Sequence, residues 1–243
     1  MTELKAENLL NLWDYGASLS PLRRCLHLLA TAWPEKSHQQ WAESRMGERD
    51  GALLSLREAL FGQTLEAVAH CPACGEPLEM RFTTAQIRAG NDLACPEGRV
   101  ELNGYEVSYR LPTSLDLLAA TEEAMGMCTE TALLRRCVLS ARYAEHPVDA
   151  GQLPAELIQA IEEGMARLDP QAETMIDLNC PQCRHSWQTS FDIAAYLWDE
   201  ISDWAVRTLR DVHTLARAYG WREHDILAMS ARRRRCYLEL LGA

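Results

Sequence analysis

The sequence predicts an α+β fold that is mostly helical, and three observations support this prediction. Apolar residues recur at helical spacing through much of the 243-residue chain. Residues 99–111 instead alternate in period two around Asn103-Gly104. Two Cys-x-x-Cys pairs, Cys71–Cys74 and Cys180–Cys183, stand far apart in the chain. We therefore expect helices around a β-hairpin and a cysteine-rich element whose two halves are separated in sequence.

Residues 1–65 are predicted to form an N-terminal helical segment. Ser20 followed by Pro21 is typical of an N-cap and a proline at the first helical position. Pro34 is expected to end that helix. A second apolar run with helical spacing stops at Gly62, and glycine often closes a helix in the left-handed conformation.

Residues 66–112 combine the first cysteine pair with the β-hairpin. Asn-Gly is the strongest short signal for a two-residue hairpin turn, because both turn positions need a positive φ angle. The alternating residues on both sides of Asn103-Gly104 are therefore predicted to pair as antiparallel strands.

Residues 113–172 are predicted to form an acidic helical insertion. Thr113, with Asp116 three residues later, resembles the start of a helix with reciprocal capping. Further helical patterns cover residues 129–142 and 154–168.

Residues 173–192 contain the second cysteine pair, and residues 193–243 are predicted to form a C-terminal helical segment. Its longest helix is expected to run from an Asp192 cap to Gly220, a length of roughly 40 Å at the usual rise per residue. Ser230 is expected to cap a final short helix.

The two cysteine pairs are predicted to form one split zinc ribbon. Each pair supplies two thiolates with the spacing of a zinc knuckle, so Cys71, Cys74, Cys180 and Cys183 complete a four-sulfur site. The pairs belong to an internal repeat. A counterpart lies 109 residues after each of Cys71, Pro72, Cys74, Leu78, Phe82 and Ala85. Four ligands close the site, so we expect a single structural Zn²⁺ with no open position for an activated water.

The cysteines and their neighbours also allow other interpretations. Cys-Pro-x-Cys also occurs at thiol-oxidoreductase sites, but neither pair is followed immediately by a helical pattern that would lower a thiol pKa. His70 and His185 flank the pairs and are expected to be bystanders, and Cys95 is expected to be a free thiol. The remaining cysteines lie in helical patterns and are assigned to packing: Cys25, Cys128, Cys137 and Cys236.

Composition narrows the classes of function. A net charge of −11 disfavours general nucleic-acid binding, and the chain has neither a long apolar run nor a secretion signal, so we expect no membrane association. No nucleophile elbow, phosphate-binding glycine loop or His-Glu-x-x-His pair is present, which predicts a protein that is not an enzyme. Binding to other proteins is the leading hypothesis, and a nucleic-acid-binding zinc ribbon is the alternative.

The predicted partner-binding residues lie in the C-terminal segment. They are Trp198, Trp204, Tyr219, Trp221, Arg232, Arg233, Arg234 and Arg235. The arginine run falls in the first turns of the final helix, where positive charge opposes the helix dipole. A requirement other than helix stability is therefore expected to explain it, and an acidic groove on a partner protein is the main functional candidate.

The chain resembles the phage baseplate family described as T4-type baseplate hub assembly chaperones, which is also found with contractile injection systems. The resemblance extends over the full length. It is carried by Leu60-Phe61-Gly62, Cys71-Pro72-Ala73-Cys74-Gly75, Leu111-Pro112-Thr113-Ser114, Asp169-Pro170-Gln171-Ala172, Phe191-Asp192-Ile193, Ala218-Tyr219-Gly220-Trp221, Asp225-Ile226-Leu227 and Tyr237-Leu238-Glu239-Leu240. Arg184 and Ala231 stand where the family pattern has glycine and proline.

The resemblance implies a non-catalytic assembly factor for the central hub or baseplate of a contractile tail. A baseplate hub, spike or tape-measure protein is then the expected partner. The expected location is the cytoplasm of the bacterial host, with the virion or injection particle as the second location. A permanent baseplate subunit is a further alternative to a chaperone that leaves after assembly.

Overall fold

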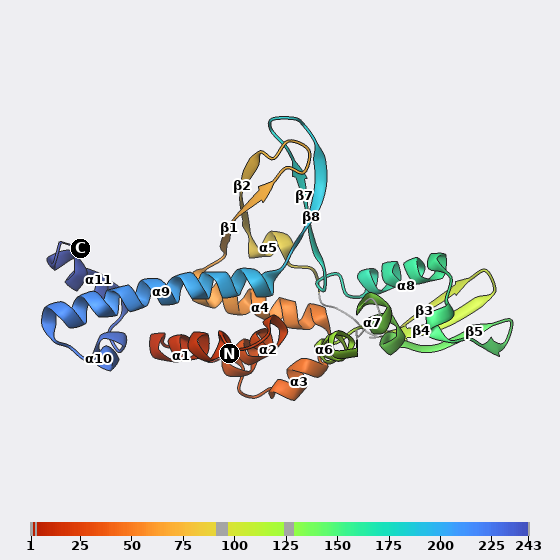
Figure 1. Ribbon diagram of the computed structural model, residues 1–243, viewed down its shortest axis with the longest axis horizontal. Coiled ribbons are helices and arrows are strands. Elements are labelled where there is room, and N and C mark those ends of the chain that lie inside the picture. Colours follow the sequence, from red (N-terminus) through yellow and green to blue (C-terminus); the bar gives the residue numbers. More distant parts are fainter. Residues whose placement is uncertain (1, 3, 91–96, 124–128, 243) are drawn as a thin grey trace. The chain divides into compact units, whose positions relative to one another are not determined.

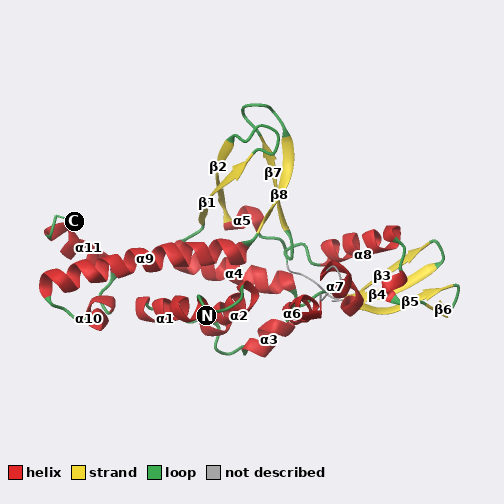
Figure 2. Ribbon diagram, viewed as in Figure 1, coloured by secondary structure: helices red, strands yellow, loops and turns green. Residues whose placement is uncertain are grey.

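The computed structural model describes residues 2, 4–90, 97–123 and 129–242, and its helices and strands are shown in Figures 1 and 2. The chain divides into two compact units. Unit 1 consists of residues 1–35 and 194–243, and unit 2 consists of residues 36–193. Among the helices of the described residues, none has the length and apolar character needed to cross a lipid bilayer.

Unit 1 contains only helices among its described residues. They are α1 (Ala6–Gly16), α2 (Pro21–Ala32), α9 (Ile193–Tyr219), α10 (Glu223–Leu227) and α11 (Ala231–Leu240). Pro21 begins α2 as predicted. The Ser230 hydroxyl accepts a hydrogen bond from the backbone N–H of Arg233, so the predicted cap of the last helix is confirmed. The 27 residues of α9 confirm the long C-terminal helix.

The core of unit 1 is formed where α1, α9 and α10 pack together. Leu10, Leu215 and Ile226 belong to one buried cluster that joins these helices. A hydrogen bond of 3.2 Å from Trp13 Nε1 to Ser202 Oγ links α1 to α9. The apolar periodicity of α9 thus predicts the face that it buries.

Unit 2 combines helices with small antiparallel sheets. Its helices are α3 (His38–Glu43), α4 (Met46–Phe61), α5 (Thr84–Ile87), α6 (Ser114–Glu123), α7 (Thr129–Cys137), the 3₁₀ helix η1 (Ala150–Gln152) and α8 (Ala155–Leu168). The strand pairs are β1 (Thr64–His70) with β2 (Pro77–Thr83), and β7 (Thr174–Asn179) with β8 (Ser186–Phe191). A further sheet has the order β3 (Glu97–Leu102), β4 (Tyr105–Arg110), β5 (Val138–Tyr143) and β6 (His146–Pro147).

The predicted β-hairpin is present as β3 and β4. Leu102 is paired with Tyr105 across the two-residue turn. Asn103 and Gly104 have φ angles of 50° and 81°, the left-handed values that this turn requires. The mostly helical α+β class is likewise observed.

The prediction of a helix over residues 129–142 is correct for residues 129–137 and wrong for residues 138–142. α7 ends at Cys137, and the next residues form β5, which pairs with the free edge of β4. Ala141 lies opposite Val107 in this pairing, and both side chains are buried. The open edge of the hairpin offers backbone partners and an apolar face, so tertiary pairing overrides the local helical pattern.

Helix α8 covers the four-stranded sheet. Its residues Leu157 and Ile161 form a buried cluster with Val107 and Tyr109 of β4. A side chain at Gly164 would collide with the hydroxyl of Tyr109, so this glycine allows the close approach of helix and strand. The helix predicted at residues 154–168 is confirmed.

Two other predicted boundaries are confirmed in unit 2. α4 ends at Phe61, and the next residue is the predicted Gly62, whose φ angle is 86°. α6 begins at the predicted cap, where Asp116 accepts a hydrogen bond from the backbone N–H of Thr113 and donates its own N–H to the Thr113 hydroxyl. The division of the chain into five segments stays a prediction.

Candidate metal centre

The first cysteine pair lies in the turn between β1 and β2. His70 and Pro77 are the last paired residues before this turn. Within it, the backbone N–H of Cys71 donates to the carbonyl of Glu76 at 2.9 Å, and the N–H of Gly75 donates to the carbonyl of Cys71 at 2.8 Å. Gly75 has a φ angle of 77°, which glycine adopts without steric cost.

The second pair repeats this turn between β7 and β8. The backbone N–H of Cys180 donates to the carbonyl of His185 at 2.8 Å, and the N–H of Arg184 donates to the carbonyl of Cys180 at 2.9 Å. Arg184 therefore replaces Gly75 at the equivalent position, and its φ angle of 62° is also left-handed. The tight turn survives without glycine, at the cost of a conformation that L side chains disfavour.

The four sulfur atoms of these turns lie together. All of them are within 4.8 Å of one another. Cys71 Sγ and Cys183 Sγ are 3.6 Å apart, and the same distance separates Cys74 Sγ from Cys180 Sγ. These distances exceed a disulfide bond length of about 2.05 Å but approach the separation of about 3.8 Å expected for two sulfurs on one tetrahedral Zn²⁺. The cluster therefore has the composition and size of a site for one tetrahedral metal ion.

The electrostatics of the cluster are those of crowded thiol groups. Backbone N–H groups of Cys183 and Gln182 lower the pKa of Cys180 to about 7. At Cys74 the N–H of Glu76 also lowers the pKa, but desolvation and the neighbouring sulfurs outweigh it and raise the pKa to about 12. Four adjacent thiolates repel one another, so a bound cation is the natural way for all four to ionise.

The cysteine cluster joins two hairpins that share no strand pairing. β1–β2 and β7–β8 are separate sheets, and Figure 1 shows them side by side with their turns at the same end. Phe82 and Phe191, which occupy equivalent places in the internal repeat, meet edge to face with ring centroids 5.5 Å apart. The repeat predicted from the sequence is therefore also a symmetry of contacts.

Two residues outside the cysteine pairs position this arrangement, and the sequence showed them only as part of a family pattern. Gln171 is buried; its Oε1 accepts from the N–H of Ala89, and its Nε2 donates to the carbonyl of Ile87 and to the Thr174 hydroxyl. It thus ties the chain after β2 to the start of β7. Asp169, also buried, accepts from the N–H of Gly47 at 2.9 Å at the first turn of α4.

The other candidate ligands lie outside the four-sulfur group. Among the described residues, neither His70 nor His185 belongs to that group, and the His185 ring is instead stacked on Trp187. Cys25 and Cys137 are buried, in agreement with a packing role. Cys236 is exposed, so its assignment to packing is wrong: the exposed face of α11 carries it. Cys95 and Cys128 lie outside the described residues.

The predicted partner-binding tryptophans of α9 are both half-buried. The guanidinium of Arg24 lies 4.1 Å from the ring centre of Trp198, and a side chain at Gly16 would collide with the same ring. Trp204 packs against the core cluster of unit 1. One side of each tryptophan ring is therefore covered. The role of both tryptophans in partner binding stays a prediction.

The other predicted partner-binding residues form two groups near the C-terminus. The Tyr219 and Trp221 rings are stacked with centroids 4.5 Å apart, and Tyr237 packs edge to face against Trp221. Arg232, Arg233 and Arg235 are exposed. Arg234 is only 6% exposed and differs in this from the expected solvated run. The partner-binding role of both groups stays a prediction.

Comparison with known proteins places these features in a family. No curated protein and no solved structure matches the chain. The family model described as T4 bacteriophage base plate protein matches residues 35–198, which is more than half of the chain and includes all four clustered cysteines. The motifs at residues 218–221, 225–227 and 237–240 lie beyond this match, so the full-length resemblance remains an expectation there. The chain belongs to the T4 bacteriophage base plate protein family.

Proposed function

We propose that this protein is a non-catalytic assembly factor for the baseplate hub of a contractile phage tail or contractile injection system, and that one structural Zn²⁺ stabilises it. Membership in the base plate family supports a structural or assembly role in the baseplate. The single observation that supports a zinc site is the convergence of four cysteine sulfurs from two turns that are distant in the sequence.

The metal acts as a staple in this proposal. It joins the β1–β2 hairpin to the β7–β8 hairpin, and the Phe82–Phe191 ring contact and the hydrogen bonds of Gln171 also link these two parts of the chain. Structural zinc sites contribute folding free energy, so loss of the ion would release the two turns from each other. The chain between the two hairpins carries α6, α7, α8 and the four-stranded sheet.

The partner in this proposal is a hub, spike or tape-measure protein of the same particle. The protein holds that partner through helical surfaces until the partner is built into the baseplate. Four clustered thiolates without an open coordination position serve structure rather than catalysis, which supports the non-catalytic part of the proposal.

The experiment is co-expression of the tagged chain with candidate hub, spike and tape-measure proteins, followed by measurement of bound protein and zinc. We expect one zinc per chain and capture of one partner. The double variant Cys71→Ser/Cys180→Ser should lose both, because it removes one ligand from each turn. Cys236→Ser is the matched control, since Cys236 is exposed and lies outside the sulfur group.

Two outcomes would contradict the proposal. If the double variant lacks zinc but captures the partner as well as the parent chain does, the metal is not required for binding. If the parent chain holds no metal and Cys71–Cys74 reacts as a redox-active pair, the oxidoreductase alternative replaces the zinc staple.

A permanent baseplate subunit is the second candidate function, because family membership fits a structural role as well as an assembly role. Quantitative mass spectrometry of finished particles separates the two. Absence from purified particles, combined with partner capture before assembly, supports the chaperone. A fixed number of copies per particle supports the structural subunit.

A further inference from the structure

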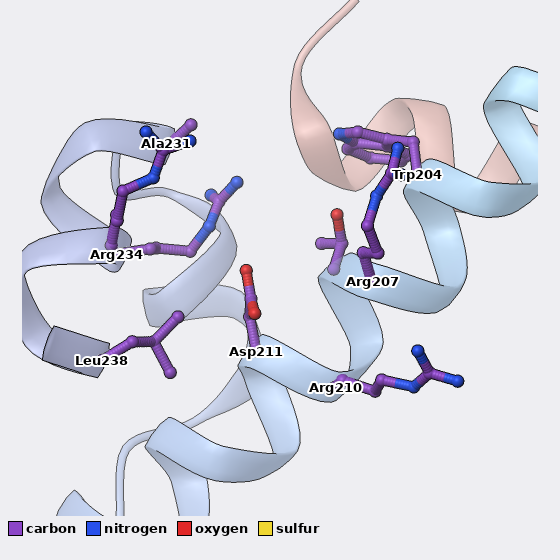
Figure 3. A pocket seen from close by; sticks show the side chains of 9 residues that line it. Trp204, Arg207, Arg210, Asp211, Ala231, Arg234 and Leu238 are labelled. Atoms are coloured by element: carbon purple, nitrogen blue, oxygen red, sulfur yellow. The ribbon is translucent and has the colours of Figure 1, made fainter. Parts of the chain in front are cut away.

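A pocket between α9 and α11 is lined by four arginines. Its volume is about 390 Å³. The lining residues are Trp204, Arg207, Thr208, Arg210, Asp211, Ala231, Arg234, Arg235 and Leu238. Four arginines thus surround one carboxylate in a chain whose net charge is −11. Figure 3 shows Arg234 and Leu238 of α11 across the pocket from Arg207 and Asp211 of α9.

Arg234 is the buried charge of this pocket and is only partly satisfied. Its Nη1 donates to the carbonyl of Met229 at 2.7 Å and lies 3.5 Å from the carbonyl of Leu227. Its Nε is buried and has no hydrogen-bond partner among the described residues. Burial lowers the pKa of Arg234, and the charge of Asp211 opposes this shift. A buried guanidinium without an acceptor on one nitrogen is costly, and an anion would remove that cost.

The surrounding arginines are available for the same anion. Within the part of the chain that the structure describes, the guanidinium groups of Arg207, Arg210 and Arg235 form no ion pair. The pocket also adjoins Ala231, the first residue of α11, where the helix dipole is positive. The arginines there oppose the dipole, and a bound anion reverses this unfavourable arrangement.

We infer that the α9–α11 pocket binds a carboxylate carried by an acidic segment of a partner protein. Planar guanidinium groups recognise carboxylates through paired, charge-assisted hydrogen bonds. Asp211 offsets one of the four positive charges, and Leu238 with Trp204 provides an apolar wall for a side chain that neighbours the carboxylate. The net charge of −11 disfavours binding of a polyanion such as nucleic acid.

The inference rests on the proposed function in one respect, namely that the ligand belongs to a protein. It goes further by assigning a chemical class to the ligand and a place to its binding site. It also gives a role to two arginines of the run in the last helix, because Arg234 and Arg235 line the pocket.

The test is a titration of the full, ¹⁵N-labelled chain followed by nuclear magnetic resonance. The probes are the capped peptide acetyl-Leu-Glu-Leu-amide, its glutamine counterpart and inorganic phosphate. We expect the glutamate peptide to shift the Nε–H signal of Arg234 saturably, and the glutamine peptide to leave it unchanged. In Arg207→Gln/Arg210→Gln the binding should weaken by about tenfold, the loss expected for a charge-assisted hydrogen bond.

The matched control is Arg217→Gln/Arg222→Gln, which removes the same charge from exposed residues of unit 1 that do not line the pocket. Its affinity should stay within about twofold of the parent chain. Equal weakening in both double variants would show nonspecific attraction and overturn the inference. An equal response to the glutamine peptide, or a response to phosphate alone, would also overturn it. Because zinc content and partner capture are measured separately, failure of the pocket and failure of the proposed function are distinguishable.

Discussion

The two cysteine turns share one backbone design but differ in what surrounds them. Both turns close through equivalent hydrogen bonds to the first cysteine. The first turn has Gly75 at its left-handed position and leads through β2 to α5, a helix of four residues. The second has Arg184 there and leads through β8 to the 27-residue α9. The turn is therefore the same in both halves of the repeat, whereas the chain that follows it differs.

The largest expected effect comes from the cysteine that begins each turn. Cys71 and Cys180 are both buried, whereas Cys74 and Cys183 are exposed. If the turns are equivalent, Cys71→Ser and Cys180→Ser should each abolish tight zinc binding and lower stability by several kcal/mol. Elemental analysis and chelator-dependent denaturation measure this effect. Full zinc content in one single variant and none in the other would break the comparison.

A region outside the repeat should respond to acid but not to chelators. Arg110 donates to both carboxylate oxygens of Asp116 at 2.6 and 2.7 Å. Burial alone would raise the pKa of Asp116, but hydrogen bonds from Arg110 and Thr113 lower it to about 2. Because the folded-state pKa lies below the ordinary value of 3.8, the stabilisation is present above pH 4 and is lost as pH falls towards 2.

Asp116→Asn should accordingly lower the free energy of unfolding near neutral pH by about 2 kcal/mol and flatten its dependence on pH below 4. Urea denaturation at several pH values, with and without a chelator, provides the measurement. An unchanged acid dependence in the variant would show that Asp116 is not the group that titrates.

Substitutions at the two left-handed positions, residues 75 and 184, test the difference between the turns directly. Arg184→Gly should stabilise the chain by about 1 kcal/mol, because glycine adopts a positive φ angle without steric cost. Gly75→Ala should destabilise it by a similar amount. Thermal denaturation of the zinc-loaded proteins measures both shifts. A destabilising Arg184→Gly would mean that the arginine side chain makes a contribution that outweighs its backbone strain.

The smallest expected effect is the coupling between the equivalent phenylalanines. The edge-to-face contact of Phe82 and Phe191 should contribute about 1 kcal/mol or less beyond the area that the rings bury. A double-mutant cycle with Phe82→Leu and Phe191→Leu isolates this coupling energy. Zero coupling would mean that the contact between the two rings does not stabilise the pairing of the hairpins.

The sequence predicted the parts of this protein that local chemistry controls. The Asn103-Gly104 turn, the cap formed by Thr113 with Asp116 and the end of α4 before Gly62 follow from local conformational preferences. The four cysteines that converge are the ones that the spacing predicted, because a knuckle is a local motif that needs only its partner pair.

Tertiary structure decided what depends on distant neighbours. The helical pattern predicted for residues 129–142 extends into residues 138–142, yet these residues form part of β5, which pairs with the open edge of β4. From the sequence, Arg234 is expected to be one of four surface charges. In the structure, α9 and the loop that precedes α11 bury it, and its Nε has no hydrogen-bond partner among the described residues. A single sequence records the preference of each residue for its local conformation, whereas burial and pairing are set by which surfaces meet when the chain folds.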